Sequence, residues 1–337
     1  MKAIVLVGGL GTRLRPLTND TPKQMLPVAG RPMIEWVAEH LGRHGVVELV
    51  LALGYRADAL LDAYPAGEIA GVAFSVAVEP EPRGTAGAVR FAADTAGVAE
   101  RCVVVNGDVL TDLDVSALIE FHESVDAAAT IALQAVDDPS RFGAVDADPA
   151  GRVRRFVEKP PPGTGPAGTA PHNLVSAGTY VLEPAVIDAI PTGRAVSIER
   201  ETFPGLVEAG TLYARTQSSY WLDTGTPQQY LTANLDVLEG RRPSARVAAD
   251  QRDDGARVRS SAVGPGCTLG RDAVVVRSVV MADCVIGEGA VVADSILGPG
   301  VSVGAASMLT DCTVVGPGER IAAGEVLRAA RRPEPAG

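Results

Sequence analysis

The last quarter of the sequence repeats an aliphatic residue every six positions, and this period constrains the fold more than any other feature. The spacing of six joins Val263, Leu269 and Val275 and, after two shifts in frame, returns from Leu297 through Ile321. Glycines follow several of these positions. A period of six residues is typical of a parallel β-helix. The repeat therefore predicts a parallel β-helix at this end of the chain.

These repeats resemble the hexapeptide repeats of left-handed parallel β-helices, in which three hexads make one triangular coil. At about 18 residues per coil, roughly four coils fit. A set of ordinary short strands in a sandwich is the alternative. Many hexapeptide-repeat proteins are acyltransferases that use a histidine base, but all four histidines of this chain precede residue 241. We therefore interpret the repeats as a scaffold for homo-oligomerisation along flat apolar faces.

The first two thirds of the chain alternate between strand-like and helix-like segments. Helical spacing covers 33–44 and 85–93, and apolar strands are predicted at 3–7, 46–53, 74–78, 102–105 and 127–135. This alternation predicts a doubly wound, mostly parallel α/β sheet of the Rossmann-like kind. Ligands of such sheets bind beyond the carboxyl ends of the strands, so residues 8–13 and 106–108 are expected at one rim.

A change in composition after Arg241-Arg242-Pro243 sets the predicted domain boundaries. We expect a catalytic domain over 1–240, a linker over 241–257, the β-helix over 258–327 and a tail over 328–337. Within the first domain, the proline- and glycine-rich stretch 160–171 is interpreted as a mobile lid.

The bulk composition excludes several classes of function. The net charge of −11 argues against a nucleic-acid partner, although a local group of cations can still attract a small anion. No apolar run of about 18 residues and no signal-peptide pattern occur, which predicts no membrane span and a cytoplasmic location. The four cysteines form no C-x-x-C pair, which disfavours a zinc site or a disulfide framework. His40 and His44 could form a metal-binding pair, but without a third ligand a solvated helix end is preferred.

A glycine-rich turn follows the first predicted strand and reads Gly8-Gly9-Leu10-Gly11-Thr12-Arg13. The backbone N–H groups of such a turn let a phosphate approach closely. The turn is neither a Walker A loop nor a full G-x-G-x-x-G motif. Of the 30 basic residues only Lys2, Lys23 and Lys159 are lysines. A compact ammonium suits one phosphate oxygen in a narrow site better than a wide guanidinium does, so Lys23 and Lys159 are candidate phosphate ligands. The alternative is that these lysines are surface residues retained by chance.

Three further segments complete the pattern, namely Asn106-Gly107-Asp108, Glu158-Lys159-Pro160 and the run from Trp221 to Pro227. With them, the chain resembles the sugar-1-phosphate nucleotidylyltransferases over about residues 1–240. Those enzymes join a nucleoside triphosphate to a sugar 1-phosphate and release pyrophosphate. Together with the repeat region, the resemblance is to mannose-1-phosphate guanylyltransferases and their relatives.

The resemblance implies roles for five side chains. Arg13 would hold the β- and γ-phosphates, Lys23 the phosphates at the reacting centre, and Lys159 the phosphate of the sugar. Asp108 and Asp223 would bind Mg²⁺, the implied cofactor, which prefers carboxylate, phosphate and water oxygens. Taken singly, each acid could instead be an ordinary turn residue. The presence of all five favours an active enzyme over a regulatory subunit that has lost catalytic residues.

The resemblance also implies a wider set of contacts. The sugar 1-phosphate is expected at Gly143, Glu158, Lys159, Ser176 and Gly178. The nucleotide is expected at Leu6, Gly8, Gly9, Gly11, Thr12, Arg13, Lys23, Glu79, Gly84, Thr85, Asn106 and Gly107.

The choice of base depends on Glu79, which stands where thymidylyl and uridylyl members of the family place a glutamine. A carboxylate only accepts hydrogen bonds, and guanine offers two adjacent donors, so GTP is predicted. A glucose-1-phosphate thymidylyl- or adenylyltransferase is the alternative. Ser176 replaces an asparagine of the relatives, which leaves mannose 1-phosphate, a related hexose phosphate and a cyclitol phosphate open.

Overall fold

The computed structural model describes residues 1–54, 57–161, 173–245 and 257–334. The chain divides into two compact units. The first unit contains residues 1–9 and 35–221, and the second contains residues 10–34 and 222–337. Each unit is described by itself.

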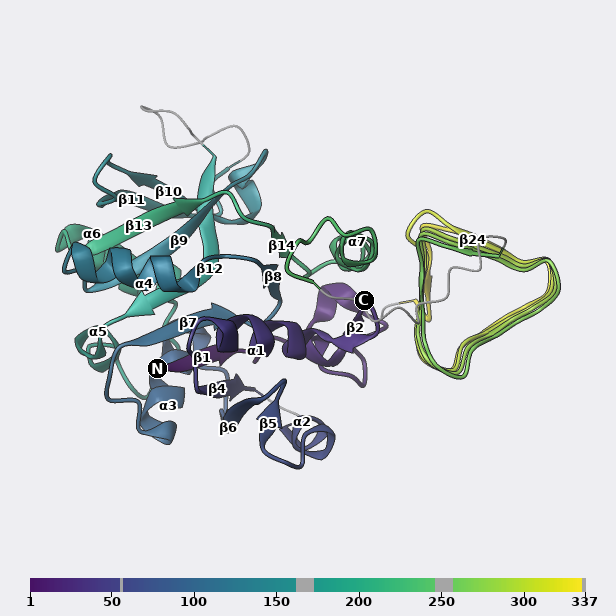
Figure 1. Ribbon diagram of the computed structural model, residues 1–337, viewed down its shortest axis with the longest axis horizontal. Coiled ribbons are helices and arrows are strands. Elements are labelled where there is room, and N and C mark those ends of the chain that lie inside the picture. The colour runs from purple at the N-terminus through teal and green to yellow at the C-terminus, as the bar shows by residue number, and fades with distance from the viewer. Residues whose placement is uncertain (55–56, 162–172, 246–256, 335–337) are drawn as a thin grey trace. The chain divides into compact units, whose positions relative to one another are not determined.

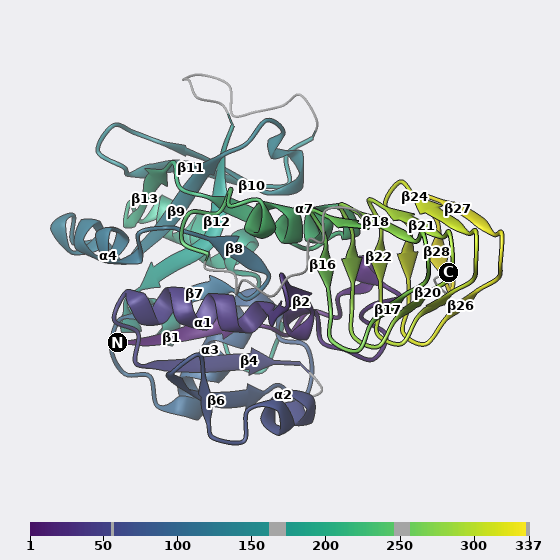
Figure 2. The ribbon, with the colours of Figure 1, turned by 45° about the vertical axis from the view of Figure 1, so that its right-hand side comes forward.

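The first unit is built on a ten-stranded sheet in the order β11-β10-β12-β7-β1-β4-β6-β5, with β9 paired to β12 and to β13. Strands β7, β1, β4 and β6 are parallel, whereas β12 runs antiparallel to β7. The sheet is therefore mixed, with the parallel strands β7, β1, β4 and β6 in its lower half in Figure 2 and a second parallel pair formed by β9 and β13. The strands are β1 Lys2–Leu6, β4 Glu48–Leu53, β5 Glu68–Ile69, β6 Val72–Val78, β7 Cys102–Asn106, β9 Ala129–Ala135, β10 Gly143–Ala147, β11 Val153–Glu158, β12 Leu174–Leu182 and β13 Leu212–Gln217.

The central strands consist mainly of apolar residues, because a strand that is covered on both faces of its sheet buries all of its side chains. In β1 the middle residues Ala3, Ile4 and Val5 are all fully buried. Helix α3 contributes Ala86, Val89 and Ala92 to the same core as Ile4, which fastens its first turn against the sheet. The remaining elements assigned here are α1 Met33–Arg43, α2 Ala57–Ala63, α3 Gly84–Ala96, β8 Val109–Thr111, α4 Val115–Ser124, the 3₁₀ turn Pro139–Arg141, α5 Pro184–Asp188, the π-helix η4 Ile198–Thr202, α6 Phe203–Glu208 and β14 Trp221–Asp223.

The histidine pair of α1 differs from the sequence-based interpretation. His40 is only 6% exposed, and the pKa of His44 is lowered by burial, so the interpretation as a solvated helix end is wrong. The two rings make an edge-to-face contact with centroids 5.0 Å apart, and His44 Nδ1 lies 3.0 Å from Ser116 Oγ. Both histidines are packed between elements because α1 buries more than one face.

The second unit contains a parallel β-helix whose triangular outline is visible in Figure 1. Two of its sheets have five strands and one has four. The sheets are β15-β18-β21-β24-β27, β16-β19-β22-β25-β28 and β17-β20-β23-β26. Their strands are β15 Val258–Arg259, β16 Ala262–Val263, β17 Thr268–Leu269, β18 Val274–Val276, β19 Val279–Val280, β20 Val285–Ile286, β21 Val291–Ala293, β22 Ile296–Leu297, β23 Ser302–Val303, β24 Met308–Thr310, β25 Val314–Val315, β26 Arg320–Ile321, β27 Val326–Arg328 and β28 Arg331–Arg332.

The coil is shorter than the expected 18 residues. In the first sheet, stacked partners are 17 residues apart from Val258 through Val275 and Val292 to Leu309. The later pairs Ile296–Val314, Ser302–Arg320 and Leu309–Leu327 are 18 apart. The shortening falls at the corner between β18 and β19 and at the same corner one coil later, which explains the two shifts in frame. Strand β28 lies within the stretch predicted as a tail.

A ladder of buried hydroxyls lines the shortened corner. Ser261 Oγ accepts from the Ser278 N–H at 3.0 Å, and Ser278 Oγ accepts from the Ser295 N–H at 3.1 Å. Each hydroxyl thus satisfies the backbone of the next coil, which a tight turn would otherwise leave unpaired. All four cysteines are free thiols, and of the three in the repeats only Cys284 is fully buried.

The rest of the second unit is formed by residues 10–34 and helix α7, Pro227–Leu238. Residues 10–34 contain two 3₁₀ turns, η1 Thr12–Leu14 and η2 Lys23–Met25, and the hairpin β2 Pro27–Val28 with β3 Arg31–Pro32. Within the described parts of the chain, no helix is long and apolar enough to cross a membrane.

Candidate active site

The carboxyl ends of β1, β4 and β7 meet at one rim of the first unit. Leu6 pairs with Asn106, and the Gly107 N–H donates to the Leu6 carbonyl at 2.9 Å. The Val7 N–H donates to Ala52 O at 3.0 Å. Residues 8, 9 and 106–108 therefore lie at the same rim, as the strand order of the sequence predicts for them.

Two glycines of this rim allow a close approach of backbone. A Cβ at Gly8 would lie 3.3 Å from Gly54 N, and a Cβ at Gly107 would lie 2.6 Å from Val7 Cγ1. The segment after β1 thus runs directly against the end of β4. Its exposed backbone can face a ligand phosphate without an intervening side chain.

The segment that carries Glu79 starts where β6 ends. Glu79 is 7% exposed, and its Oε2 accepts a hydrogen bond from the Arg83 N–H at 3.1 Å. Burial raises the pKa of Glu79, and the bond from Arg83 opposes that rise. The carboxylate therefore stabilises the turn 79–83. One of its oxygens, Oε2, accepts from the backbone within that turn.

The first turn of α3 is fixed by a segment more than a hundred residues away. Thr85 Oγ1 donates to Glu199 Oε2 at 2.7 Å and accepts from the Ile198 N–H at 2.8 Å. The Val196 carbonyl accepts from the Ala86 N–H at 3.0 Å. This clamp determines where Gly84 and Thr85 stand. The sequence suggested that residues 196–201 shape the site, but it did not identify the partner of Glu199.

Gly84 is the point of closest contact in this clamp. Its φ is +70°, and a Cβ there would lie 2.6 Å from Val196 O. Only glycine combines this left-handed backbone conformation with so close an approach to the backbone of Val196.

Acidic and hydroxyl groups gather in the same unit around the residues at which the sugar phosphate is expected. Burial, followed by the negative charge of Glu199, raises the pKa of Tyr180, and the charges of Glu158 and Asp108 act in the same direction. Burial, followed by the charge of Glu199, also raises the pKa of Glu158, whereas Lys159 lowers it. The charges of three carboxylates therefore act on one tyrosine hydroxyl. Such a group of acceptors suits the hydroxyl donors of a sugar.

Lys159 stands at the edge of this group. Its Nζ lies 3.5 Å from Glu158 Oε1, and its side chain is 61% exposed. Its backbone has φ +49°, an uncommon value for a lysine, and its N–H donates to the Phe142 carbonyl at 2.9 Å. The backbone thus holds the residue in a sharp turn while the ammonium remains accessible to an anion.

The strand β12 changes register where the predicted sugar contacts lie. Gly178 has φ +73°, and a Cβ there would lie 2.6 Å from Asn106 Nδ2. Ser176 Oγ lies 3.4 Å from the Tyr180 hydroxyl. Gly143 pairs with Glu158 in the neighbouring strands β10 and β11. The first unit therefore brings Asn106, Gly143, Glu158, Ser176 and Gly178 to one region.

The second unit holds Gly11, Thr12, Arg13, Lys23 and Asp223. Gly11 has φ +61°, and its carbonyl accepts from Thr18 Oγ1 at 2.8 Å. A Cβ at Gly225 would lie 2.5 Å from Arg13 Nη2 and 2.8 Å from Asp223 Oδ1, so the guanidinium and the carboxylate converge on this glycine. Lys23 begins the second 3₁₀ turn.

Each of the two predicted metal ligands, Asp108 in the first unit and Asp223 in the second, is a carboxylate, a donor that suits Mg²⁺. Among the described residues, no three His, Cys, Asp or Glu side chains come together as a complete metal site. Mg²⁺ is commonly held by one or two carboxylates together with substrate phosphates and water. Asp108 and Asp223 are carboxylates of that kind. The predicted lid falls largely on residues 162–172, which lie outside the described residues.

A glycine turn at the rim of the sheet and a group of carboxylates beside a buried tyrosine fit an enzyme that acts on phosphate groups and sugars. Residues 2–240 match the nucleotidyl transferase family, and the chain belongs to that family. Residues 251–331 match the GMPPB C-terminal domain. The chain is a sugar-1-phosphate nucleotidyltransferase, an enzyme of nucleotide-sugar synthesis whose substrates are a nucleotide and a sugar phosphate.

Several relatives are guanylyltransferases. A mannose-1-phosphate guanylyltransferase of Mycobacterium tuberculosis is 38% identical over 283 residues, which cover 82% of this chain and 75% of the relative. Mannose-1-phosphate guanylyltransferase 1 of Arabidopsis thaliana is 38% identical over 283 residues, covering 82% and 76%. The crystal structure of HddC from Yersinia pseudotuberculosis is similar with a TM-score of 0.59 and 32% identity, over 69% of this chain and 97% of that one. HddC has also been solved in complex with GMP-PN, with a TM-score of 0.58.

Proposed function

We propose that the chain transfers the guanylyl group of GTP to mannose 1-phosphate and releases pyrophosphate. The observation that carries the choice of base is the buried Glu79 at the end of β6, a carboxylate at the rim where the base is expected. Guanine presents two adjacent donors to such an acceptor. The guanylyltransferase relatives and the GMP-PN complex of HddC support the same choice.

The chemistry needs positioning and charge stabilisation rather than a covalent intermediate. The attacking group is a phosphate oxygen of the sugar 1-phosphate, which is already anionic and attacks the α-phosphorus in line. Lys159 orients that phosphate, and Lys23 stabilises charge at the reacting centre. Arg13 stabilises the departing β- and γ-phosphates. Backbone N–H groups of Gly8, Gly9, Gly11 and Thr12 contact the nucleotide, as do Leu6, Gly84, Thr85, Asn106 and Gly107.

Asp108 and Asp223 are the proposed ligands of Mg²⁺. When bound, the ion would neutralise part of the phosphate charge. On the sugar side, Glu158 and Ser176 accept from hydroxyls, while Gly143 and Gly178 leave space for the ring.

We further propose the domain limits that the sequence gives for catalysis, 1–240, and for the linker, 241–257. The β-helix, predicted over 258–327, continues through β28 at Arg331–Arg332, so the predicted tail over 328–337 begins too early. A homo-oligomer formed through the β-helix and a cytoplasmic location stay predictions of the sequence.

The test is pyrophosphate release with GTP, dTTP, UTP and ATP, each combined with mannose 1-phosphate, glucose 1-phosphate and a cyclitol phosphate. GTP with mannose 1-phosphate is expected to be the best pair. A preference for dTTP or UTP would refute the role of Glu79. Failure to release pyrophosphate with any pair would favour a regulatory subunit.

A further inference from the structure

The last coil of the β-helix contacts residues 10–34 of the same unit, which include Arg13 and Lys23 and are called here the phosphate-binding segment. Arg331 Nη1, on β28, donates to the Arg15 carbonyl at 3.0 Å. Arg15 follows Arg13 by two residues and ends the turn Thr12–Leu14, where its own N–H donates to Thr12 O at 3.3 Å. The guanidinium of Arg331 therefore holds the end of the turn that carries Arg13.

A second contact lies beside the first. A Cβ at Gly316 would lie 3.0 Å from Pro16 Cβ and 3.1 Å from Pro16 Cγ, so the ring of Pro16 rests directly on this glycine. Gly316 follows β25, which pairs with β28. The fully buried neighbours Leu14 and Leu17 show that the segment on this side of Arg13 is packed.

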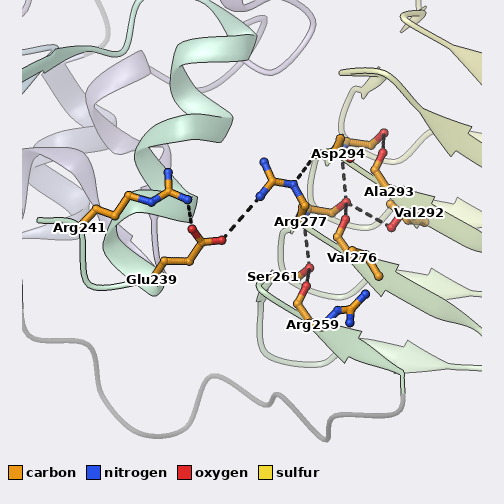
Figure 3. Close-up of polar contacts among 11 residues, drawn as sticks. Glu239, Arg241, Arg259, Ser261, Val276, Arg277, Val292, Ala293 and Asp294 are labelled. Atoms are coloured by element: carbon orange, nitrogen blue, oxygen red, sulfur yellow. Dashed lines mark hydrogen bonds and ion pairs between the residues drawn. The ribbon is translucent and has the colours of Figure 1, made fainter.

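Helix α7 ties the same segment to the β-helix from another direction. The Ala29 N–H donates to Asn234 Oδ1 at 2.8 Å. Beyond the end of α7, Glu239 lies 3.7 Å from Arg277, which in turn donates from Nε to Asp294 at 2.9 Å (Figure 3). These charges are exposed and contribute little on their own, but they join α7 to the corner between β18 and β19.

We propose that the β-helix positions the phosphate-binding segment and that Arg331 is a positioning residue for Arg13. The inference rests on the proposed function, in which Arg13 binds the β- and γ-phosphates. Arg331 touches no substrate in this scheme. It acts by fixing the Arg15 carbonyl, and so restricts where the guanidinium of Arg13 can stand. A displacement of about 1 Å in such a group can lower a rate by up to about 100-fold.

The experiment compares the Kd of GTP with the Kd of GMP, in the presence of Mg²⁺ and without a sugar phosphate, by calorimetry on the full chain. GMP lacks the two phosphates that Arg13 would hold. Arg331→Ala is expected to weaken GTP about tenfold and to leave GMP unchanged, because only the phosphate contact is loosened. Arg331→Lys, which keeps a cationic donor, is expected to recover part of the loss. Arg328→Ala, at an exposed arginine of the neighbouring strand β27, is the matched control and is expected to change neither Kd.

A second substitution tests the same contact and leaves Arg331 unchanged. Gly316→Ala places a methyl group against Pro16 and is expected to weaken GTP more than GMP as well. Unchanged GTP binding in folded Arg331→Ala and Gly316→Ala would overturn the inference, and so would an equal loss for GTP and GMP.

Arg13→Ala separates this inference from the function on which it depends. If Arg13→Ala weakens GTP alone while Arg331→Ala and Gly316→Ala do not, the positioning role is refuted and the proposed function stands. If Arg13→Ala leaves both constants unchanged, the proposed role of Arg13 fails first.

Discussion

Replacing Glu79 by glutamine tests the choice of base at a single position. In the native chain Oε2 of Glu79 accepts from the Arg83 N–H at 3.1 Å. A glutamine that keeps this bond must place its oxygen where Oε2 was, because its nitrogen cannot accept. Its NH₂ group then occupies the position of Oε1, which in the proposed site accepts from the base. The structure therefore dictates the orientation of the new amide.

The cost to GTP follows from that orientation. A hydrogen bond to a charged acceptor contributes about 1.5–3 kcal/mol, and the new NH₂ opposes a guanine donor instead of accepting from it. One such loss corresponds to roughly 10- to 100-fold in kcat/KM. Thymine and uracil each offer carbonyl oxygens, to which an NH₂ can donate. Selectivity is thus expected to move from GTP towards dTTP and UTP.

The assay is pyrophosphate release with mannose 1-phosphate and each of the four nucleotides. Glu81→Gln is the matched control, since Glu81 is an exposed acid two residues away and is expected to leave every ratio unchanged. If Glu79→Gln retains the native ratio of GTP to dTTP, the carboxylate does not read the base and the reasoning fails.

Four further changes are expected to have defined results. Asp108→Asn should lower pyrophosphate release more than about 100-fold with little change in Tm, because it removes a metal ligand's charge but little volume, and near-native turnover would contradict this role. Glu199→Gln should raise the KM for the nucleotide severalfold by weakening the 2.7 Å bond from Thr85, whereas an unchanged KM would show that the clamp is dispensable. Gly178→Ala should lower Tm in a thermal scan, since its Cβ would meet Asn106 at 2.6 Å and φ is +73°, and a native Tm would rule out the strain. The native kcat/KM for GTP should fall as the pH falls through the raised pKa of Glu79, where protonation removes an acceptor, and Glu79→Gln should lack this limb of the pH profile.

Local periodicity explains how much of the fold the sequence could predict. The apolar run before Gly8 and the spacing of the helix Met33–Arg43 each depend on neighbouring residues, and both elements are present within one or two residues of their predicted limits. The six-residue repeat likewise predicted the stacked sheets. Its two frame shifts fall at corners where Ser278 and Ser295 are buried, and the structure was needed to show that their backbone N–H groups are satisfied by serine hydroxyls of the preceding coil.

Parts of the candidate site depend on contacts that no local pattern encodes. The bond between Thr85 and Glu199 joins residues 114 apart in sequence. The interpretation of His40 as part of a solvated helix end was wrong for the same reason. The residues of one helix do not reveal that a second element covers one of its faces. The family pattern identified residues that would touch substrate, whereas the groups that hold those residues in place became apparent only from the structure.

The turn that carries Arg13 shows why such support is needed. In a Walker A loop the phosphate-binding backbone continues into a helix, whose cooperative hydrogen bonds keep it in place. Here the glycine turn leads into a 3₁₀ helix of only three residues, Thr12–Leu14. So short a helix is not stable by itself, and its rigidity must come from tertiary contacts. The carbonyl that ends it accepts from Arg331, 316 residues later in the sequence. In the proposed scheme this turn gains its order from the β-helix, which would give the repeat region a part in catalysis although it contains no histidine base.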